Sequence, residues 1–304
     1  MNHRLSLFLA SVVAAIVAIG RGQLLESRDL LEKPEPDTDC RCGGKKVTRR
    51  DGELSGGNDS DVNEFPFMCG LADIDAKKIY CGCTIISDQY ILTAAHCVQD
   101  RDVSSVGIVV GKPDAGTGFN RRADATRFLR LDIFMIHPQY QRYRVSPCYD
   151  IAIVRTVAKI EFSAEVGPAC LPFQKNQTLF TDSKITALGW GLLEFGGKQP
   201  VALQKADFDV ISLQECRKSY QTLRNIYITD DAFCTFTPDK DACHFDSGGP
   251  LLWRNPDTNN LVVVGITSGG AGCEGRYPSI AMRTGAFLNW IKSVTPDANY
   301  CEIE

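Results

Sequence analysis

The sequence carries no strong excess of charge of either sign. It has 304 residues, with 33 Lys and Arg against 37 Asp and Glu and a formal net charge of −4 at pH 7. A basic face is the usual electrostatic footprint of a nucleic-acid-binding protein, so no nucleic-acid partner is expected. Internal repeats and low-complexity tracts are also lacking. The length then fits one large all-β unit or two small barrels.

Histidine is scarce as well, with four residues in the whole chain. No two of them stand at the spacing of zinc ligands, and the cysteines are expected in disulfides. The sequence therefore predicts no metal site, and we expect no cofactor.

Long hydrophobic runs are missing except at the N-terminus. There the basic segment 2–4 precedes an apolar run over 5–19, and small residues end the run at 18–20. This run is too short to span a membrane comfortably, so residues 1–20 are interpreted as a secretory signal peptide. The rest of the chain offers no membrane-spanning segment. We therefore expect a secreted, extracellular and soluble protein with no membrane partner.

After a polar, proline-containing segment, short apolar runs alternate with turn residues. Residues 85–92 are one such run, in which Ser87 and Asp88 separate two apolar stretches. This spacing is typical of a β-barrel or sandwich. Only residues 286–294 place apolar side chains at helical spacing. The sequence therefore predicts two antiparallel barrels followed by a C-terminal α-helix.

Three separate segments carry the side chains of nucleophilic catalysis. Ser247 lies between an aspartate and two glycines, which indicates a hydroxyl on a tight turn where a carbonyl group can approach main-chain N–H donors. A serine hydroxyl is a weak nucleophile unless a neighbouring base takes its proton. His96, in the segment TAAHC, follows a β-rich run and can supply that base. Asp150 enters an apolar strand and offers a carboxylate to orient the histidine.

The other three histidines are assigned elsewhere. His3 leaves with the signal peptide, and His137 lies in a turn-like setting suited to a surface or structural role. His244, three residues before Ser247, is expected either to contact the substrate or to be merely exposed. A core or capping role is the alternative for His96, which otherwise remains the candidate base.

The order His96, Asp150, Ser247, with these flanking segments, resembles the chymotrypsin-like (trypsin-fold) serine endopeptidases. The resemblance extends from Leu54 to about Val294. Segments such as NEFP and GPACLPF are most similar to secreted insect enzymes, in particular hymenopteran venom serine proteases.

The resemblance implies an all-β fold in which two six-stranded antiparallel β-barrels, at about 54–166 and 174–285, precede the C-terminal α-helix. It also divides the chain into a signal peptide (1–20), an activation peptide (21–53) and a trypsin-like serine protease domain (54–304).

In this family, acyl transfer to the serine is followed by hydrolysis. The resemblance makes His96 the base and then the acid, with Asp150 holding its tautomer. The backbone N–H groups of Phe245 and Ser247 would form the oxyanion hole. The family nearly always has glycine at the position of Phe245, and a side chain there resists the required backbone geometry. This departure predicts a weaker enzyme rather than an inactive one.

The substrate pocket follows from the same resemblance. Asp241 matches the aspartate at the pocket base of trypsin-like members, which implies cleavage after Arg or Lys because a buried carboxylate selects cations. Ser268 and Gly270 keep the family residues. Ser279 stands where a pocket wall is usually glycine, and Gly269 replaces a tryptophan of the substrate cleft.

Members of this family are made as zymogens, and the new N-terminus pairs with the aspartate before the serine, here Asp246. A pair of glycines aligns that N-terminus with Leu54, so the activating cut would follow Glu53 rather than Arg or Lys. A cut after Arg50 would leave an end that is three residues too long. We therefore expect an activating protease of different specificity.

All thirteen cysteines lie beyond the signal peptide, as expected for an oxidising compartment. The disulfides that the resemblance implies are Cys81–Cys97, Cys216–Cys234 and Cys243–Cys273. Cys69 and Cys83 flank a polar hairpin symmetrically, which predicts a bridge between neighbouring antiparallel strands. Cys148 is the candidate for the odd cysteine outside this framework.

Two cysteines lie in the leader, Cys40 and Cys42. The resemblance implies that one of them pairs with Cys170, and Cys301 is expected to take the other.

Two functions of different classes remain. The first is a secreted serine endopeptidase made as a zymogen, with venom as the setting that the narrower resemblance suggests. The second is a serine protease homologue with weak or no activity that acts as a binding or regulatory module. Expected partners are protein or peptide substrates, an activating protease and protein inhibitors, and a monomer is expected. Asn58 and Asn176 begin N-glycosylation sequons.

Overall fold

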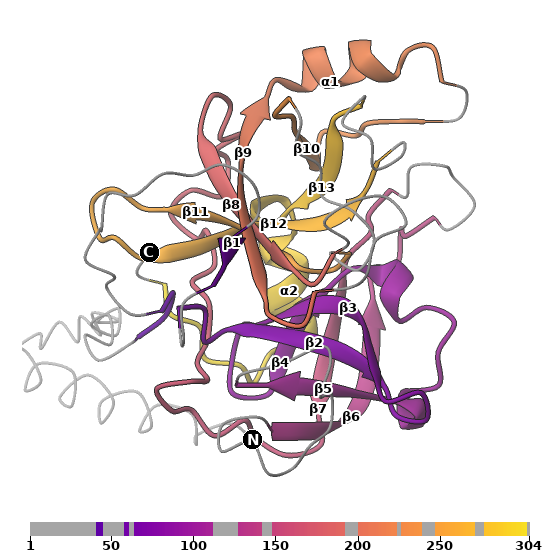
Figure 1. The fold of residues 1–304 in the computed structure, drawn as a ribbon, viewed down its shortest axis with the longest axis vertical. Coiled ribbons are helices and arrows are strands. Elements are labelled where there is room, and N and C mark those ends of the chain that lie inside the picture. The colour runs from indigo at the N-terminus through magenta and orange to yellow at the C-terminus, as the bar shows by residue number, and fades with distance from the viewer. Residues whose placement is uncertain are drawn as a thin grey trace, which may run out of the picture. The chain divides into compact units, whose positions relative to one another are not determined.

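The computed structural model describes most of the chain from residue 41 onward. The described residues are 41–44, 58–60, 64–111, 127–141, 148–191, 200–223, 226–238, 247–270 and 277–302. They belong to one compact unit that spans residues 37–304. Strands form most of its regular structure and pair into two antiparallel sheets (Figure 1).

The first sheet closes into a six-stranded barrel in the order β2-β3-β4-β7-β6-β5. Its strands are β2 (Met68–Asp73), β3 (Lys78–Ile85), β4 (Tyr90–Thr93), β5 (Val106–Val110), β6 (Arg127–Ile136) and β7 (Ala152–Thr156). Strands β4, β5 and β7 are almost wholly buried, which suits their Val and Ile side chains. In the β2–β3 hairpin, Cys69 stands directly opposite Cys83.

The second sheet closes in the order β8-β9-β10-β13-β12-β11, because β8 pairs with both β9 and β11. Its strands are β8 (Lys184–Gly189), β9 (Gln204–Ile211), β10 (Ala232–Thr235), β11 (Pro250–Arg254), β12 (Leu261–Gly269) and β13 (Ser279–Arg283). The prediction of two six-stranded antiparallel barrels is therefore confirmed.

One short strand departs from the predicted division of the chain. Strand β1 (Asn58–Asp59) pairs with Lys205 and Gln204 of β9, so it extends the second sheet. The predicted boundary of about 54–166 places residues 58–59 in the first barrel. A two-residue strand has no apolar pattern of its own, and backbone pairing with a distant segment decides its place.

Two α-helices and three 3₁₀ turns complete the described structure. They are η1 (Ala95–Cys97), η2 (Val103–Ser105), α1 (Leu213–Tyr220), η3 (Thr284–Phe287) and α2 (Leu288–Val294). Helix α2 is the predicted C-terminal helix, whereas α1 was not predicted. Ser212 caps α1, because its Oγ accepts from the N–H of Glu215 while the Glu215 carboxylate accepts from the N–H of Ser212. Helix α1 buries only two of its eight side chains, too few for a periodic apolar pattern.

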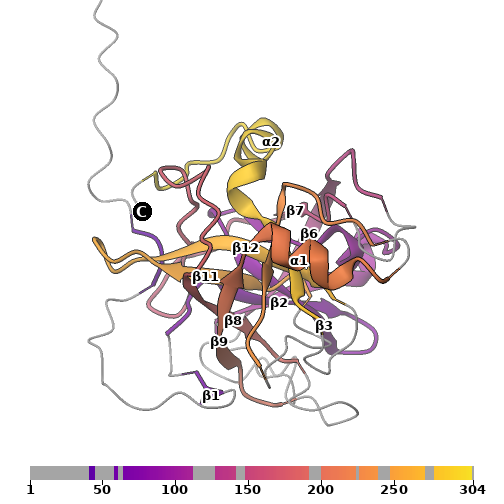
Figure 2. The ribbon, with the colours of Figure 1, turned by 90° about the horizontal axis from the view of Figure 1, so that it is seen from above.

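Side chains from both barrels and from helix α2 share one hydrophobic cluster, so the barrels pack against each other through a common core. Leu71 of the first barrel, Val263 of the second and Ile291 of α2 are members with no exposed surface. Helix α2 lies beside the place where the barrels meet (Figures 1 and 2). His137, expected in a surface or structural role, is buried beside this helix and meets Trp290 of the helix edge-on.

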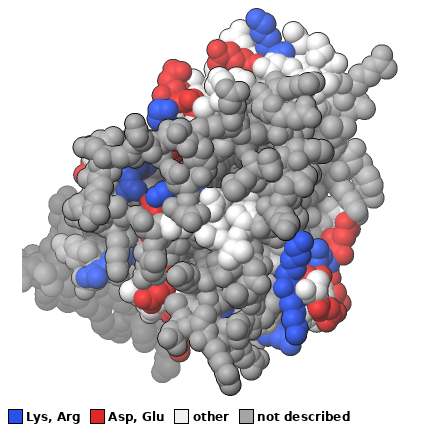
Figure 3. Space-filling view, viewed as in Figure 1, with Lys and Arg blue, Asp and Glu red and all other residues white. Residues whose placement is uncertain are grey.

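The surface of the described residues mixes both signs of charge. On the face in Figure 3, Lys and Arg side chains lie among Asp and Glu side chains rather than in a basic field. Within the described residues, no helix combines the length and the apolar character that crossing a membrane requires.

Candidate active site

His96 lies in the 3₁₀ turn η1, directly after strand β4. The small residues Ala94 and Ala95 have no exposed surface, which lets this turn pack closely against the first barrel. The disulfide between Cys81 and Cys97 ties the turn to β3, with the two Cα atoms 6.2 Å apart. The turn therefore holds the backbone of His96 firmly while 32% of its side chain remains exposed.

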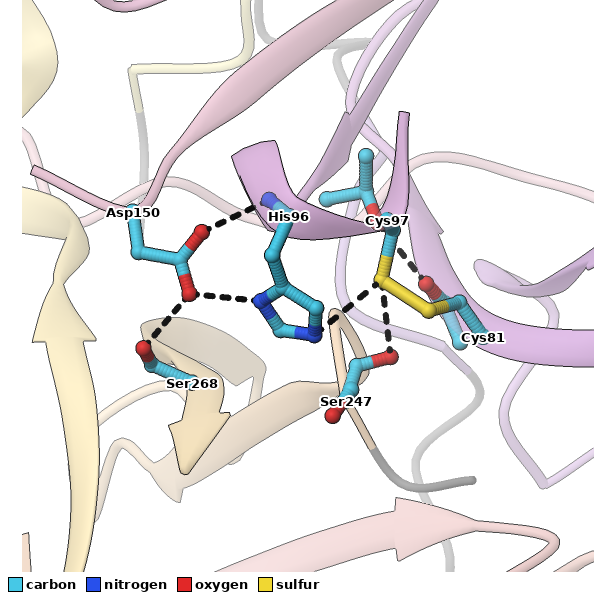
Figure 4. Close-up of a disulfide and its surroundings, with 8 residues drawn as sticks. Cys81, His96, Cys97, Asp150, Ser247 and Ser268 are labelled. Carbon is cyan, nitrogen blue, oxygen red and sulfur yellow. Dashed lines mark hydrogen bonds and ion pairs between the residues drawn. A yellow bond between two sulfur atoms is a disulfide. The ribbon is translucent and has the colours of Figure 1, made fainter. Parts of the chain in front are cut away.

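Asp150 precedes strand β7 and has no exposed surface. Its Oδ1 accepts a hydrogen bond from the backbone N–H of His96 at 2.9 Å, and its Oδ2 accepts from Nδ1 of the same residue at 2.7 Å (Figure 4). The hydroxyl of Ser268 also donates to Oδ2, at 2.6 Å. A buried carboxylate needs such donors to offset its lost hydration. Because an ionised carboxylate only accepts, Nδ1 carries the proton and Nε2 of the neutral ring keeps its lone pair.

This pairing also changes the acidity of the histidine. Burial lowers the pKa of His96, but the hydrogen bond and the negative charge of Asp150 together raise it more, and the net pKa lies above its ordinary value. The ring is thereby made a better proton acceptor at Nε2.

Ser247 lies on a turn that is held by backbone hydrogen bonds to both barrels. Its carbonyl oxygen accepts from the N–H of Gly82 in β3 at 2.8 Å, and the N–H of Gly248 donates to the carbonyl of Thr267 at 2.8 Å. Gly248 has φ of 79°, and a Cβ there would lie 2.3 Å from Oγ1 of Thr93. Glycine is therefore required after the serine both by conformation and by space.

The turn of Ser247 and the ring of His96 both lie close to one sulfur atom. Sγ of Cys97 is 3.7 Å from Nε2 of His96 and 3.7 Å from the carbonyl oxygen of Ser247 (Figure 4). In this part of the structure, Oγ of Ser247 makes no hydrogen bond to Nε2. Such a bond is often long before a substrate binds. The structure thus brings together the histidine and the aspartate, with the serine close by.

The donor atoms of Cys81, His96 and Cys97 lie within 4.8 Å of one another, a grouping that resembles a metal site. The two sulfurs are bonded to each other, however. Metal ligation by cysteine requires a thiolate, so this cluster does not fit a metal ion.

The residues expected in the substrate pocket lie at the ends of two paired strands. Ser268 and Gly269 end β12 and Ser279 begins β13. A Cβ on Gly270 would lie 3.6 Å from Cα of Ser279, so these two residues are adjacent. Ser268 has a contact that the sequence did not predict, because its hydroxyl reaches Asp150.

Tyr220 lies beside these expected pocket residues and was not predicted from the sequence. Its ring stacks on Tyr277, with centroids 5.5 Å apart, and its hydroxyl donates to the carbonyl of Pro278. The same hydroxyl would lie 3.6 Å from a Cβ on Gly270. Tyr220 is the last residue of helix α1. The Ser-x-x-Glu pattern at 212–215, which marks the start of a helix, was the sequence feature that could have indicated α1.

Several predicted positions lie outside the described residues. They are Cys40, Glu53, Leu54, Asp241, Cys243, His244, Phe245, Asp246 and Cys273.

Four disulfides are present among the described cysteines. They are Cys42–Cys170, Cys69–Cys83, Cys81–Cys97 and Cys216–Cys234. Cys42 is thus the leader cysteine that pairs with the connector between the barrels. Cys301 is also disulfide-bonded, and Cys148 is a buried thiol.

The two sequons lie in different surroundings. The backbone of Asn58 pairs with Lys205 in β1–β9. Asn176 is half-buried in a turn, where its backbone carbonyl oxygen accepts a hydrogen bond from the guanidinium of Arg283 at 2.6 Å.

The fold and this constellation define a class of protein. The family model described as Trypsin matches residues 54–291. The chain therefore belongs to the trypsin family of serine proteases.

Similar proteins come from several arthropods. "Venom serine protease 34" of Apis mellifera is 40% identical over 276 residues, which is 90% of this chain but 65% of that protein. "Venom serine protease" of Polistes dominula is 35% identical over 88% of this chain and 93% of its own length. "Clotting factor G beta subunit" of Tachypleus tridentatus is 30% identical over 84% of this chain and 82% of its own length. The chain thus spans less than two thirds of the Apis protein.

Proposed function

We propose that the protein is a secreted serine endopeptidase, made as a zymogen, that hydrolyses peptide bonds through Ser247, His96 and Asp150. One observation carries the proposal: the buried Asp150 carboxylate engages both the backbone and the ring of His96, beside the turn of Ser247. A buried carboxylate that orients an imidazole is the arrangement that turns a histidine into a general base. Membership of the trypsin family supports the same reaction.

The reaction follows from the protonation states. Nε2 of His96 takes the proton of Ser247 as the hydroxyl oxygen attacks the scissile carbonyl carbon. The imidazolium then gives this proton to the leaving amine, and an acyl-enzyme remains. Water attacks the ester carbonyl in turn and gives a proton to Nε2. The ester C–O bond then breaks, Nε2 returns that proton to Oγ of Ser247, and the carboxylic acid product leaves. Asp150 stays ionised throughout and stabilises the imidazolium.

The negative charge that develops on the carbonyl oxygen needs donors of its own. We assign this role to the backbone N–H groups of Ser247 and Phe245. Loss of one such donor typically lowers turnover by about 10²–10³-fold. Because Phe245 replaces the usual glycine, a modest turnover is expected.

For specificity we propose cleavage after Arg or Lys, with Asp241 at the base of the pocket. The adjacency of Gly270 and Ser279 supports a pocket wall at this end of the second barrel. Asp241→Ser is expected to remove the preference for Arg and Lys over Phe and Leu while Ser247 stays reactive. Equal hydrolysis of basic and aromatic substrates by the wild type would contradict this assignment.

For activation we propose a cut between Glu53 and Leu54, after which the new ammonium group pairs with Asp246. The family match also begins at residue 54, which supports this boundary. The N-terminal apolar run and the disulfides support secretion, and the relatives named as venom proteases support venom as the setting. Protein or peptide substrates, an activating protease and protein inhibitors are the partners of such an enzyme.

Two observations favour a second function, that of a weakly active or inactive homologue that binds or regulates other proteins. Oγ of Ser247 and Nε2 of His96 share no hydrogen bond in the described structure, and Phe245 occupies a position where glycine is usual. A phosphonylating serine reagent separates the two functions. We expect covalent labelling of Ser247 in protein that starts at Leu54, and no labelling of Ser247→Ala. If that protein is neither labelled nor able to hydrolyse peptides, the homologue is the correct description.

A further inference from the structure

Tyr149, the residue before Asp150, has an unusual backbone conformation. Its φ angle is 55°, in the left-handed region that bulky side chains rarely adopt. Its carbonyl oxygen accepts from the N–H of Ile151 at 2.8 Å, which closes a three-residue turn with Asp150 at the centre. The conformation of Tyr149 therefore helps to set the direction in which the Asp150 side chain leaves the backbone.

Aromatic contacts hold Tyr149 in this conformation. Its ring lies nearly parallel to His137, with centroids 5.2 Å apart and planes 6° apart, and meets the edge of Phe287 at 6.2 Å. His137 in turn meets Phe287 at 5.4 Å and Trp290 at 4.9 Å, both edge-on. We call these four residues the aromatic cluster. Stacked and edge-to-face pairs of this kind add to the free energy of burial and so offset backbone strain.

His137 holds the same turn by a second link. Its backbone N–H donates to the carbonyl of Ile151 at 3.1 Å, while its ring stacks on Tyr149. One residue thus fixes both sides of the turn around Asp150.

The ring of His137 is suited to this contact because it is neutral. It is 8% exposed, and its Nδ1 accepts from the N–H of Gln139 at 3.3 Å. Burial lowers the pKa of His137, and the carboxylate of Asp231 raises it by less.

We propose that Tyr149 and His137 are positioning residues for the reaction: their stacked rings hold the turn that aims the Asp150 carboxylate at His96. This rests on the proposed function of the same site. The two oxygens of Asp150 bond to two different groups of His96, at 2.9 and 2.7 Å. A rotation of the carboxylate therefore lengthens at least one of these bonds.

Three substitutions of Tyr149 separate the effect of losing its aromatic ring from the effect of its strained backbone conformation. Tyr149→Phe keeps the ring, Tyr149→Ala removes it and keeps the strain, and Tyr149→Asn removes it but tolerates the left-handed conformation. Phe180→Ala is the matched control. Phe180 is also buried with φ of 55°, and its ring packs on Trp253 at 5.3 Å in a separate hydrophobic cluster.

We expect Tyr149→Ala and Tyr149→Asn to lower kcat about 10–100-fold, with KM changed by less than about threefold, because a small misplacement of a catalytic group is costly. The pKa of His96 in the pH profile of kcat/KM should fall, because Asp150 raises it less when displaced. Tyr149→Phe should retain the wild-type kcat and the wild-type pKa of His96. Phe180→Ala should lower the melting temperature but leave kcat and this pKa unchanged.

The proposal is overturned if Tyr149→Ala and Tyr149→Asn keep the wild-type kcat and His96 pKa, or if Phe180→Ala changes them as much. Nuclear magnetic resonance of protein labelled with ¹⁵N-histidine gives a readout without turnover, since the whole chain has four histidines. A downward shift of the His96 pKa in Tyr149→Ala supports the proposal, and an unchanged value overturns it. If the wild type hydrolyses no peptide, the proposed function fails, yet this measurement still decides the positioning role.

Discussion

Gly82→Ala should disable Ser247, the proposed nucleophile, without unfolding the protein. A Cβ on Gly82 would lie 2.7 Å from Cα and 2.9 Å from N of Gly249, both backbone atoms of the turn that carries Ser247. Carbon atoms pack best at about 3.5–4.0 Å, so the turn would have to move by about 0.8 Å or more. A displacement of about 1 Å can cost about 100-fold in rate. Overpacking of this kind typically costs about 1–3 kcal/mol of stability.

Gly70 provides the control, because it is the cross-strand partner of Gly82 in the β2–β3 hairpin. The three atoms nearest to a Cβ on Gly70 would all be side-chain carbons of Ile79, the nearest at 2.8 Å. Gly70→Ala should therefore show a similar loss of stability and nearly wild-type kcat. The assay combines peptide hydrolysis, titration of reactive serine and thermal unfolding. Wild-type turnover in Gly82→Ala, or equal loss in both variants, would refute the reasoning.

Hydrolysis should be lost as the pH falls through the pKa of His96, because only the neutral ring takes the serine proton. Burial lowers that pKa but the paired carboxylate raises it more, so a pH–rate profile should give a midpoint above the ordinary 6.5. Protein that starts at Leu54 should be active, and protein cut only after Arg50 should be nearly inactive. Peptide hydrolysis measures the activity of each form and N-terminal sequencing identifies its first residue; full activity of protein that starts at Asp51 would contradict this expectation. At least one of Asn58 and Asn176 should carry a glycan, and an unchanged mass of secreted protein after glycosidase treatment would exclude it.

The parts of the site that could be predicted from the sequence are those that local geometry dictates. Gly248 must be glycine because its φ is 79° and a Cβ would clash. The glycine after Ser247 in the sequence therefore already indicates the tight turn that the structure shows. Ala94 and Ala95 are small because the turn before His96 is packed against the barrel. Cys69 and Cys83 could be paired because a hairpin places residues symmetric about its turn opposite one another.

The parts that could not be predicted depend on contacts between distant segments. The sequence around Tyr149 does not indicate a left-handed backbone conformation. The rings that stabilise this conformation belong to distant residues, namely His137 directly after β6 and Phe287 near the C-terminus. The link from Ser268 to Asp150 likewise joins the two barrels. Strand β1 is placed by its backbone pairing with β9, far away in the sequence. Local pattern predicts the elements, whereas these details follow from how the elements meet.

The disulfide between Cys42 and Cys170 joins residues 128 positions apart, on opposite sides of the expected cut at Glu53. Hydrolysis there would divide the polypeptide into two chains and yet release no fragment. The mass of the cleaved, unreduced protein would exceed that of the uncleaved protein only by one water molecule. Its elution volume in gel filtration would hardly change. The severed leader would also remain near the domain at an effective concentration on the order of millimolar. Maturation would therefore alter the connectivity of the protein while conserving its composition.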